Sequence, residues 1–245
     1  MESETRKLAA ELAPPVRSVT IPVRGLMLLL SAAVVVAVLL SLVQDLLIFL
    51  APEAGFTDRI YRLDLDTEAS LPTWLSSCLM LVCSLALLAI GVAVKRESLL
   101  KALPWLLLAA AFLLLSLDEA ISLHEWLSAA IGARVNNTGI FYFVWAAPAL
   151  VLCLAGLACF LPFILGFKGL DRALLIGSAI VFLSGAVGVE MLGGMEAEVG
   201  GIETLRYRLL SSLEESLEFA GLLIFLLFLL RRLRAAHNRL TIRFE

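Results

Sequence analysis

Long uninterrupted runs of apolar residues constrain this chain more than any other feature. Six such runs each hold about twenty residues, the length that a helix needs to cross the roughly 30 Å hydrocarbon core of a bilayer. Hydrophobic residues make up 61% of the 245 positions, against roughly 45–50% in an average soluble domain. The sequence therefore predicts an all-α, polytopic membrane helical bundle with six transmembrane helices. We expect them at residues 25–50, 73–94, 104–130, 140–165, 173–192 and 209–230.

Basic residues are distributed unevenly over the predicted connections. Fourteen of the nineteen lysines and arginines lie in the first 24 residues, in the second and fourth connections, and after residue 230. Because basic segments stay preferentially in the cytoplasm, we expect both termini there, as an even number of spans also requires. Residues 1–24 then form a cytoplasmic arm, 25–230 the transmembrane domain and 231–245 a basic cytoplasmic tail. We expect a bacterial inner (plasma) membrane protein, and the net charge of −3 does not indicate a nucleic-acid partner.

Ionisable side chains interrupt the third predicted span. Residues 112–126, FLLLSLDEAISLHEW, place Asp118, Glu119, His124 and Glu125 among apolar and small residues. Each such group costs roughly 2.5–3.5 kcal/mol at a helix centre on insertion scales, which indicates a functional role. Asp118 and Glu125 share one helical stripe, whereas His124 points about 120° away from Asp118 on an ideal helix. Either a π-bulge distorts this helix or His124 faces a different neighbour.

Acidic residues of three predicted spans fall at one depth. Helical rise places Asp118 about 22 Å, Glu190 about 25 Å, Glu214 about 25 Å and Glu218 about 20 Å from the cytoplasmic ends of their spans. We therefore expect a common pocket in the outer half of the bilayer. Its acids are Asp118, Glu119, Glu190, Glu214, Glu215 and Glu218, and the basic residues within reach are Arg134, Arg206 and Arg208. So many carboxylates must be protonated, wetted by a cavity or neutralised by metal cations, and each alternative points to a site.

The available ligand types narrow the chemistry of that site. The chain has two histidines and lacks H-E-x-x-H, the E-x-x-H of di-iron proteins, a Walker loop and G-x-S-x-G. A metal centre here would be oxygen-rich, which suits the divalent ions of Mg, Mn, Ca or Fe. We expect metal ligands among Asp118, Glu119, His124, Glu190, Glu214 and Glu218. We expect Asp118, His124 and Glu125 to carry catalysis.

Two motifs resemble the signature of a group of bacterial multi-pass membrane proteins whose activity is not known. The first is S-x-D-E-x5-H-E, formed by Ser116, Asp118, Glu119, His124 and Glu125. The second is E-E-x-x-E, formed by Glu214, Glu215 and Glu218. The resemblance covers two spans and implies no particular reaction.

Three functions remain open on the sequence alone. The acids would serve a metal-dependent enzyme acting on a membrane lipid or lipid-linked substrate from the outer leaflet, or a proton- or cation-coupled transporter. They would equally suit a structural or accessory subunit, satisfied by a membrane partner protein or by a second copy of the chain. Local explanations also exist, because Glu214 and Glu215 near a helix start would offset the macrodipole. Glu119 and Glu125 would snorkel to the outer surface.

Overall fold

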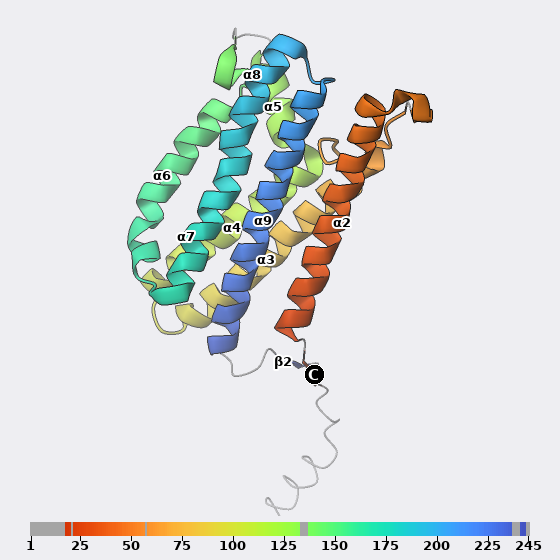
Figure 1. The fold of residues 1–245 in the computed structure, drawn as a ribbon. Coiled ribbons are helices and arrows are strands. Elements are labelled where there is room, and N and C mark those ends of the chain that lie inside the picture. Colours follow the sequence, from red (N-terminus) through yellow and green to blue (C-terminus); the bar gives the residue numbers. More distant parts are fainter. Residues whose placement is uncertain (1–17, 21, 57, 133–136, 237–240, 244–245) are drawn as a thin grey trace, which may run out of the picture.

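The described chain is almost entirely helical, as the apolar runs predict. The computed structural model describes residues 18–20, 22–56, 58–132, 137–236 and 241–243 (Figure 1). Its helices are α2 (Val23–Leu50), α3 (Leu71–Lys95), α4 (Leu99–Ile121), α5 (Leu123–Gly132), α6 (Ala146–Leu165), α7 (Gly169–Leu183), α8 (Glu190–Gly200) and α9 (Leu205–Ala236). A π-helical segment, η4 (Ser184–Val189), joins α7 to α8. The shorter elements are the 3-10 turns η1 (Pro52–Ala54), η2 (Tyr61–Leu63) and η3 (Gly139–Phe141) and the strands β1 (Ser18–Thr20) and β2 (Thr241–Arg243).

Five helical segments of the described residues are long and apolar enough to cross a membrane. They are α2, α3, α4, α6 and the continuous run Gly169–Gly200. The sixth long helix, α9, has 32 residues and carries three glutamates in its first half and three arginines near its end. It lies in the middle of the bundle, with Phe219, Leu226 and Phe228 fully buried. The predicted all-α membrane bundle is thus confirmed, with α9 in the place of the sixth predicted span.

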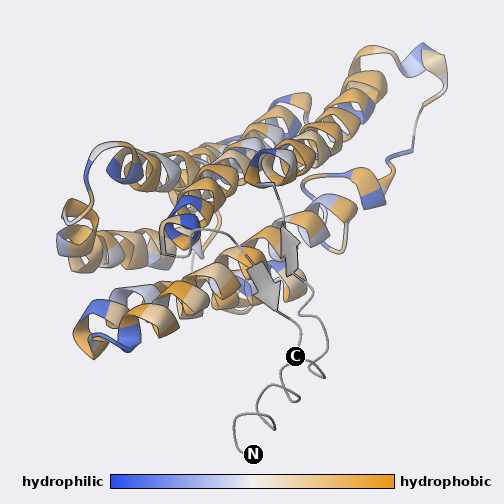
Figure 2. Cartoon of the chain, turned by 90° about the horizontal axis from the view of Figure 1, so that it is seen from below, coloured by the Kyte–Doolittle hydropathy of each residue, from blue (hydrophilic) through white to orange (hydrophobic). Residues whose placement is uncertain are grey.

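Apolar side chains also cover the outside of the bundle. Leu28 of α2 and Leu152 of α6 are each 72% exposed, and apolar residues occupy most of the length of the helices (Figure 2). Water would make so large an exposed apolar surface unfavourable, whereas lipid chains cover it without that cost. This surface agrees with insertion of the bundle in a bilayer.

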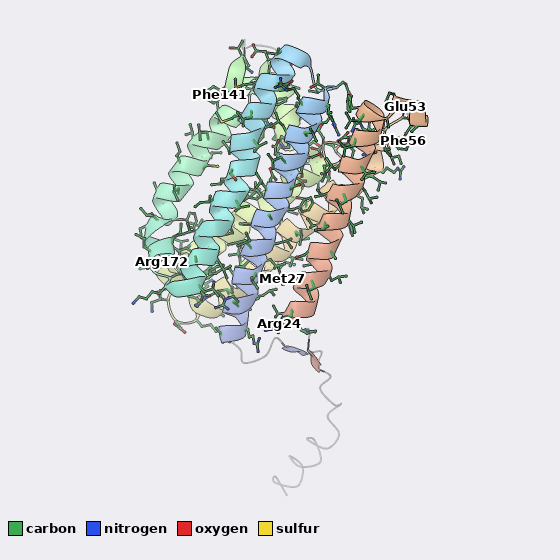
Figure 3. All side chains as sticks on the ribbon, viewed as in Figure 1. Arg24, Met27, Glu53, Phe56, Phe141 and Arg172 are labelled. Atoms are coloured by element: carbon green, nitrogen blue, oxygen red, sulfur yellow. The ribbon has the colours of Figure 1, made fainter. Side chains whose placement is uncertain are left out.

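The first and last described segments, strands β1 and β2, lie together at one end of the bundle (Figure 1). Strands β1 and β2 pair antiparallel, with Ser18 opposite Arg243. Arg24 and Arg172 lie at this end, whereas Glu53 and Phe141 lie at the opposite end (Figure 3). The first and last described segments thus share one side of the bundle, as the prediction for the termini requires, and the assignment of that side to the cytoplasm stays a prediction. Most of the predicted N-terminal arm and the end of the predicted tail lie outside the described residues.

The fifth predicted span is longer than expected. The prediction ended it at residue 192 and assigned residues 193–207 to a loop, but the helix continues to Gly200. The glycines in this stretch serve close packing, since a Cβ on Gly194 would lie 3.3 Å from side-chain atoms of Tyr142 and Phe143. The helix ends only at Gly201, where φ is +80°. Glycine content alone was therefore a misleading sign of a loop.

Hydroxyl groups join α3 to α4. The Ser77 hydroxyl donates to the Ser116 carbonyl at 2.8 Å, and the Ser116 hydroxyl donates to the Ser77 carbonyl at 2.8 Å. About two helical turns further along, the Ser84 hydroxyl donates to the carbonyl of Ala109 at 2.7 Å. Such hydrogen bonds between helices hold spans together where lipid supplies no hydrophobic driving force. Ser116 of the first motif thus supports the hairpin that positions Asp118 and Glu119.

Two glycines let α9 approach the preceding span closely. A Cβ on Gly185 would lie 2.7 Å from the Glu214 carbonyl oxygen, and a Cβ on Gly221 would lie 2.6 Å from the Cβ of Phe182. Neither position leaves space for a methyl group while the helices keep their separation. The close approach brings the glutamates of α9 beside the start of α8.

Candidate functional site

A break in the third span places Asp118 and His124 in contact. Ser122 adopts φ = +54° between α4 and α5, so the predicted continuous helix over residues 104–130 is wrong. The Asp118 carboxylate accepts a hydrogen bond from the His124 backbone N–H at 2.8 Å and contacts His124 Nδ1 at 2.9 Å. The break reorients His124 toward Asp118, which an ideal helix would have prevented. A π-helical distortion does occur, but in η4 of the following span.

Acidic side chains from four parts of the chain line one cavity of about 380 Å³. Asp118 and Glu119 come from the end of α4, Glu190 opens α8, and the glutamates of the second motif come from α9. The connection between α2 and α3 adds two more acids to the wall. The complete set of acidic lining residues is Asp66, Glu68, Asp118, Glu119, Glu190, Glu214, Glu215 and Glu218, and His124 lines the cavity with them.

The predicted convergence of the acids therefore occurs in the structure. All six residues expected as metal ligands line this cavity, although their role as ligands stays a prediction. The side chain of Glu125, expected to take part in catalysis, lies outside the described side chains. Asp45 of α2 is fully buried and is absent from the described lining of the cavity.

Glu190 and Glu214 meet across the interface between α8 and α9. Their carboxyl groups lie within electrostatic reach of each other, and Trp145 Nε1 donates to Glu190 Oε1 at 2.9 Å. The His124 ring lies 5.1 Å from the Trp145 ring, centroid to centroid. The Asp118–His124 pair and the Glu190–Glu214 pair thus flank the same indole.

The remaining glutamates of the cavity are less well satisfied. Glu119 lies near the Ser76 hydroxyl. Among the described residues, neither Glu215 nor Glu218 takes part in a hydrogen bond, although each lies within electrostatic reach of Glu119. Deeply placed carboxyl groups without protein donors require water, protons or a cationic ligand. The macrodipole and snorkelling explanations do not account for their orientation into a common cavity.

A buried ion-pair network forms the wall next to the α2–α3 connection. Arg208 of α9 contacts Asp64, Asp66 and Asp45, with 2.5 Å to Asp66 Oδ2 and 3.5 Å to Asp45 Oδ1. Arg59 contacts Asp45 and lies 3.4 Å from Asp64 Oδ2. These five side chains, which we call the Asp–Arg network, tie the connection to the ends of α2 and α9.

Local hydrogen bonds complete the network. Asp64 is fully buried and accepts from the hydroxyls of Thr67 at 3.0 Å and Ser41 at 3.5 Å. Asp66 accepts from Ser211 at 2.7 Å and from Tyr207 at 3.4 Å. Burial raises the pKa of Asp66, and the nearby Arg208 guanidinium partly offsets that rise. Asp66 belongs both to the network and to the cavity wall.

Sequence reasoning missed this wall because its residues lie in a polar connection. Residues 51–72 fall between the first two predicted spans, yet Asp64 and Leu65 are buried inside the bundle. A usable signal was the D-x-D-x-E spacing of Asp64, Asp66 and Glu68 directly before the α3 cap, Ser70.

The cavity has no positive charge of its own among the described lining residues. Neither lysine nor arginine lines it. Of the basic residues expected nearby, Arg208 belongs to the Asp–Arg network, Arg206 pairs with Glu196 at 3.8 Å with its side chain 84% exposed, and Arg134 lies outside the described residues. The lining therefore favours positively charged occupants, including protons.

Within the part of the chain that the structure describes, no three histidine, cysteine or carboxylate groups are placed to hold a metal ion together. The acids surround the cavity instead of converging on a single point. The predicted metal therefore stays a prediction, and its binding would require the long glutamate side chains to move inward or to contact it through water.

A family model matches almost the whole helical region. The model is described as "Domain of unknown function (DUF8692)" and matches residues 27–233. The chain belongs to the DUF8692 family. The matched range extends from α2 into α9, so the DUF8692 domain includes every described residue that lines the cavity. No curated protein and no solved structure matches the chain.

Proposed function

We propose that this DUF8692 protein is a membrane-embedded, metal-dependent enzyme that acts on a lipid or lipid-linked substrate. The observation that carries the proposal is the cavity itself. Eight carboxyl groups and one histidine surround it without a lysine or arginine among its described lining residues. A divalent cation of the Mg, Mn, Ca or Fe type would offset part of this charge with oxygen ligands.

The volume supports a substrate in addition to an ion. About 380 Å³ falls in the range of roughly 300–1,000 Å³ that small-molecule pockets occupy. A hydrated divalent cation alone needs a smaller volume, since a water molecule occupies about 30 Å³ in the liquid. The bundle that holds this cavity has an apolar outer surface, which supports a membrane lipid as the partner molecule.

Asp118 and His124 would supply acid–base chemistry. Asp118 contacts Nδ1 of the imidazole and also fixes the backbone at His124. A carboxylate at one ring nitrogen orients the ring and selects its tautomer. Any proton that His124 exchanges with a substrate must then travel through Nε2. A divalent cation in the acidic cavity would polarise the substrate or a water molecule beside this pair.

Manganese binding tests the metal part of the proposal. Protein purified without chelators is titrated with Mn²⁺ and free Mn²⁺ is followed by electron paramagnetic resonance. We expect Glu218→Gln to weaken binding about tenfold or more, because it removes a charged ligand candidate. Glu203→Gln, an exposed change of the same charge outside the described cavity lining, should bind Mn²⁺ like the wild-type protein. Absence of Mn²⁺ binding, or equal binding by both variants, contradicts the proposal.

Lipid conversion tests the enzymatic part. A labelled lipid extract is incubated with the protein and Mn²⁺, and products are separated by chromatography. Asp118→Asn keeps a carbonyl oxygen for the His124 N–H but loses the charge at Nδ1, so we expect product formation to fall about 10²- to 10⁴-fold. If Asp118→Asn converts lipid at the wild-type rate, the assigned role of the pair is wrong.

Interrupted helices favour cation-coupled transport as a second candidate. The α4–α5 break at Ser122 and the π-helical segment η4 both adjoin the cavity. Transporters commonly build ion sites from such discontinuous spans. Proteoliposomes with a trapped pH dye should then show proton flux that Glu190→Gln abolishes. Flux equal in wild-type and variant vesicles excludes this candidate.

A further inference from the structure

One part of the acidic cavity combines aromatic rings with carboxyl groups. The aromatic lining residues are Phe143, Trp145, Phe182 and Tyr207. Trp145 donates to Glu190, and Tyr207 lies within electrostatic reach of Glu190 and Glu214. We call Trp145, Tyr207, Glu190 and Glu214 the aromatic half of the cavity. Its composition differs from that of the glutamates around Glu119, where the polar contact comes from Ser76.

The two groups of residues suit different kinds of positive charge. Hard divalent cations take oxygen ligands, and neither an indole nor an aromatic ring face supplies one. An ammonium group, in contrast, is attracted both to aromatic faces and to carboxylates. Its N–H groups spread over several acceptors, which suits acids that surround a space without converging as a metal-ligand set in the described chain.

The unpartnered glutamates provide an independent reason to expect a ligand. Among the described residues, Glu215 and Glu218 take part in no hydrogen bond, although both line the cavity. Eight lining carboxyl groups and the absence of lysine and arginine from the described lining make the cavity unfavourable for an anionic ligand. A phosphate attached to the ligand would therefore remain outside the cavity while a positively charged group enters it.

We infer that the aromatic half of the cavity binds the ammonium group of an amine, either the head group of an aminolipid or a soluble amine of similar size. The inference rests on the proposed function in taking this cavity as the working site, and it names the substrate class. A cavity of about 380 Å³ has the volume of roughly a dozen water molecules. It therefore accommodates an aminoethyl group together with a hydrated cation.

Matched amphiphiles test the recognition of the ammonium group. Purified protein in detergent is titrated calorimetrically with n-octylamine and with n-octanol, which share a chain and differ in charge. We expect octylamine to bind and octanol to bind at least tenfold more weakly. Tyr207→Leu and Trp145→Leu should each weaken octylamine binding about 5- to 30-fold, and Glu190→Gln should weaken it at least as much. Tyr207→Phe retains a ring and should bind within about threefold of the wild-type protein.

Controls separate recognition from folding. Trp74→Leu removes an indole that is 64% exposed and outside the described cavity lining, so it should bind octylamine like the wild-type protein. Helical content measured by circular dichroism identifies variants that do not fold. If the leucine variants of Tyr207 and Trp145 do not fold, the octylamine affinity of Glu190→Gln is compared with that of Tyr207→Phe and Trp74→Leu. Equal binding of octylamine and octanol, or wild-type octylamine binding by Glu190→Gln and Tyr207→Leu, overturns the inference.

The source of the amine is distinguished by competition. Ethanolamine in solution and phosphatidylethanolamine in nanodiscs are each used to displace octylamine, with phosphatidylglycerol nanodiscs as the reference. Displacement by phosphatidylethanolamine alone identifies a lipid head group, and displacement by ethanolamine alone identifies a soluble amine. Displacement by neither, or equally by both nanodisc types, contradicts ammonium recognition. The Mn²⁺ titration is independent, so amine binding without Mn²⁺ binding ends the metal proposal and leaves this inference intact.

Discussion

Replacement of Arg208 by methionine tests whether the Asp–Arg network holds the α2–α3 connection in place. The Arg208 side chain is 6% exposed, and the side chains of Asp45 and Asp64 are fully buried, so solvent screens these contacts weakly. Three aspartates and two arginines give the network a formal charge of −1, and the substitution makes it −2. Removing one partner from a buried ion pair costs about 3–5 kcal/mol. We expect a loss of that size in the free energy of unfolding.

The assay is reversible unfolding in mixed micelles, followed by circular dichroism at increasing denaturing detergent. Arg206→Met is the matched control, because the Arg206 side chain is 84% exposed; its expected cost is below about 0.5 kcal/mol. The double variant Asp64→Asn with Arg208→Met restores the formal charge of −1 and keeps an acceptor for Thr67. We expect it to recover about 1–3 kcal/mol relative to the single Arg208→Met variant. A double variant less stable than Arg208→Met, or an Arg208→Met loss below about 1 kcal/mol, refutes the reasoning.

Three further predictions concern backbone strain, helix packing and pH. Ser122 and Ala69 have φ of +54° and +57°, so Ser122→Gly and Ala69→Gly should each stabilise the fold by about 1 kcal/mol; lower melting temperatures for both would contradict this. Gly221→Ala places a Cβ 2.6 Å from the Cβ of Phe182 and should cost about 1–3 kcal/mol, and an unchanged detergent unfolding midpoint would contradict close packing. Burial raises the pKa of Asp66 above its ordinary value of 3.8. The folded state then holds that proton more tightly, so stability should fall as pH rises from about 3.8 through the raised pKa. Asp66→Asn should remove this part of the pH dependence in unfolding measured at several pH values, and an identical slope in the variant would contradict it.

The depth of the acids was predictable because helical rise is nearly constant. Counting along each span placed Asp118, Glu190, Glu214 and Glu218 in one layer, and all four line the cavity. The assumption of a regular helix also made the prediction for residues 104–130 wrong. The backbone break at Ser122 changes which side chains face each other, and serine gives no strong signal for a left-handed conformation.

The second wall of the cavity was not predictable from periodicity. Asp66 and Glu68 belong to a connection without a repeating pattern, and their positions follow from tertiary contacts with Arg208 and Tyr207 on α9. Trp145 was equally difficult, because an aromatic residue at the end of a span usually marks the membrane interface. Its indole instead donates to Glu190. Contacts between residues more than 40 positions apart decide these roles.

The orientation of Glu190 depends on the number of residues in η4, which is six, as well as on their identity. Because each residue advances a helix by about 100°, deleting one residue between Ser184 and Val189 would turn all of α8 by that angle relative to α7. Glu190 would then face away from Glu214 while every acid of the two motifs remained in the chain. A relative that keeps both motifs but has one residue fewer in this stretch would therefore lack the acidic cavity. The number of residues in η4 is then a better criterion for the presence of the cavity than the acids themselves.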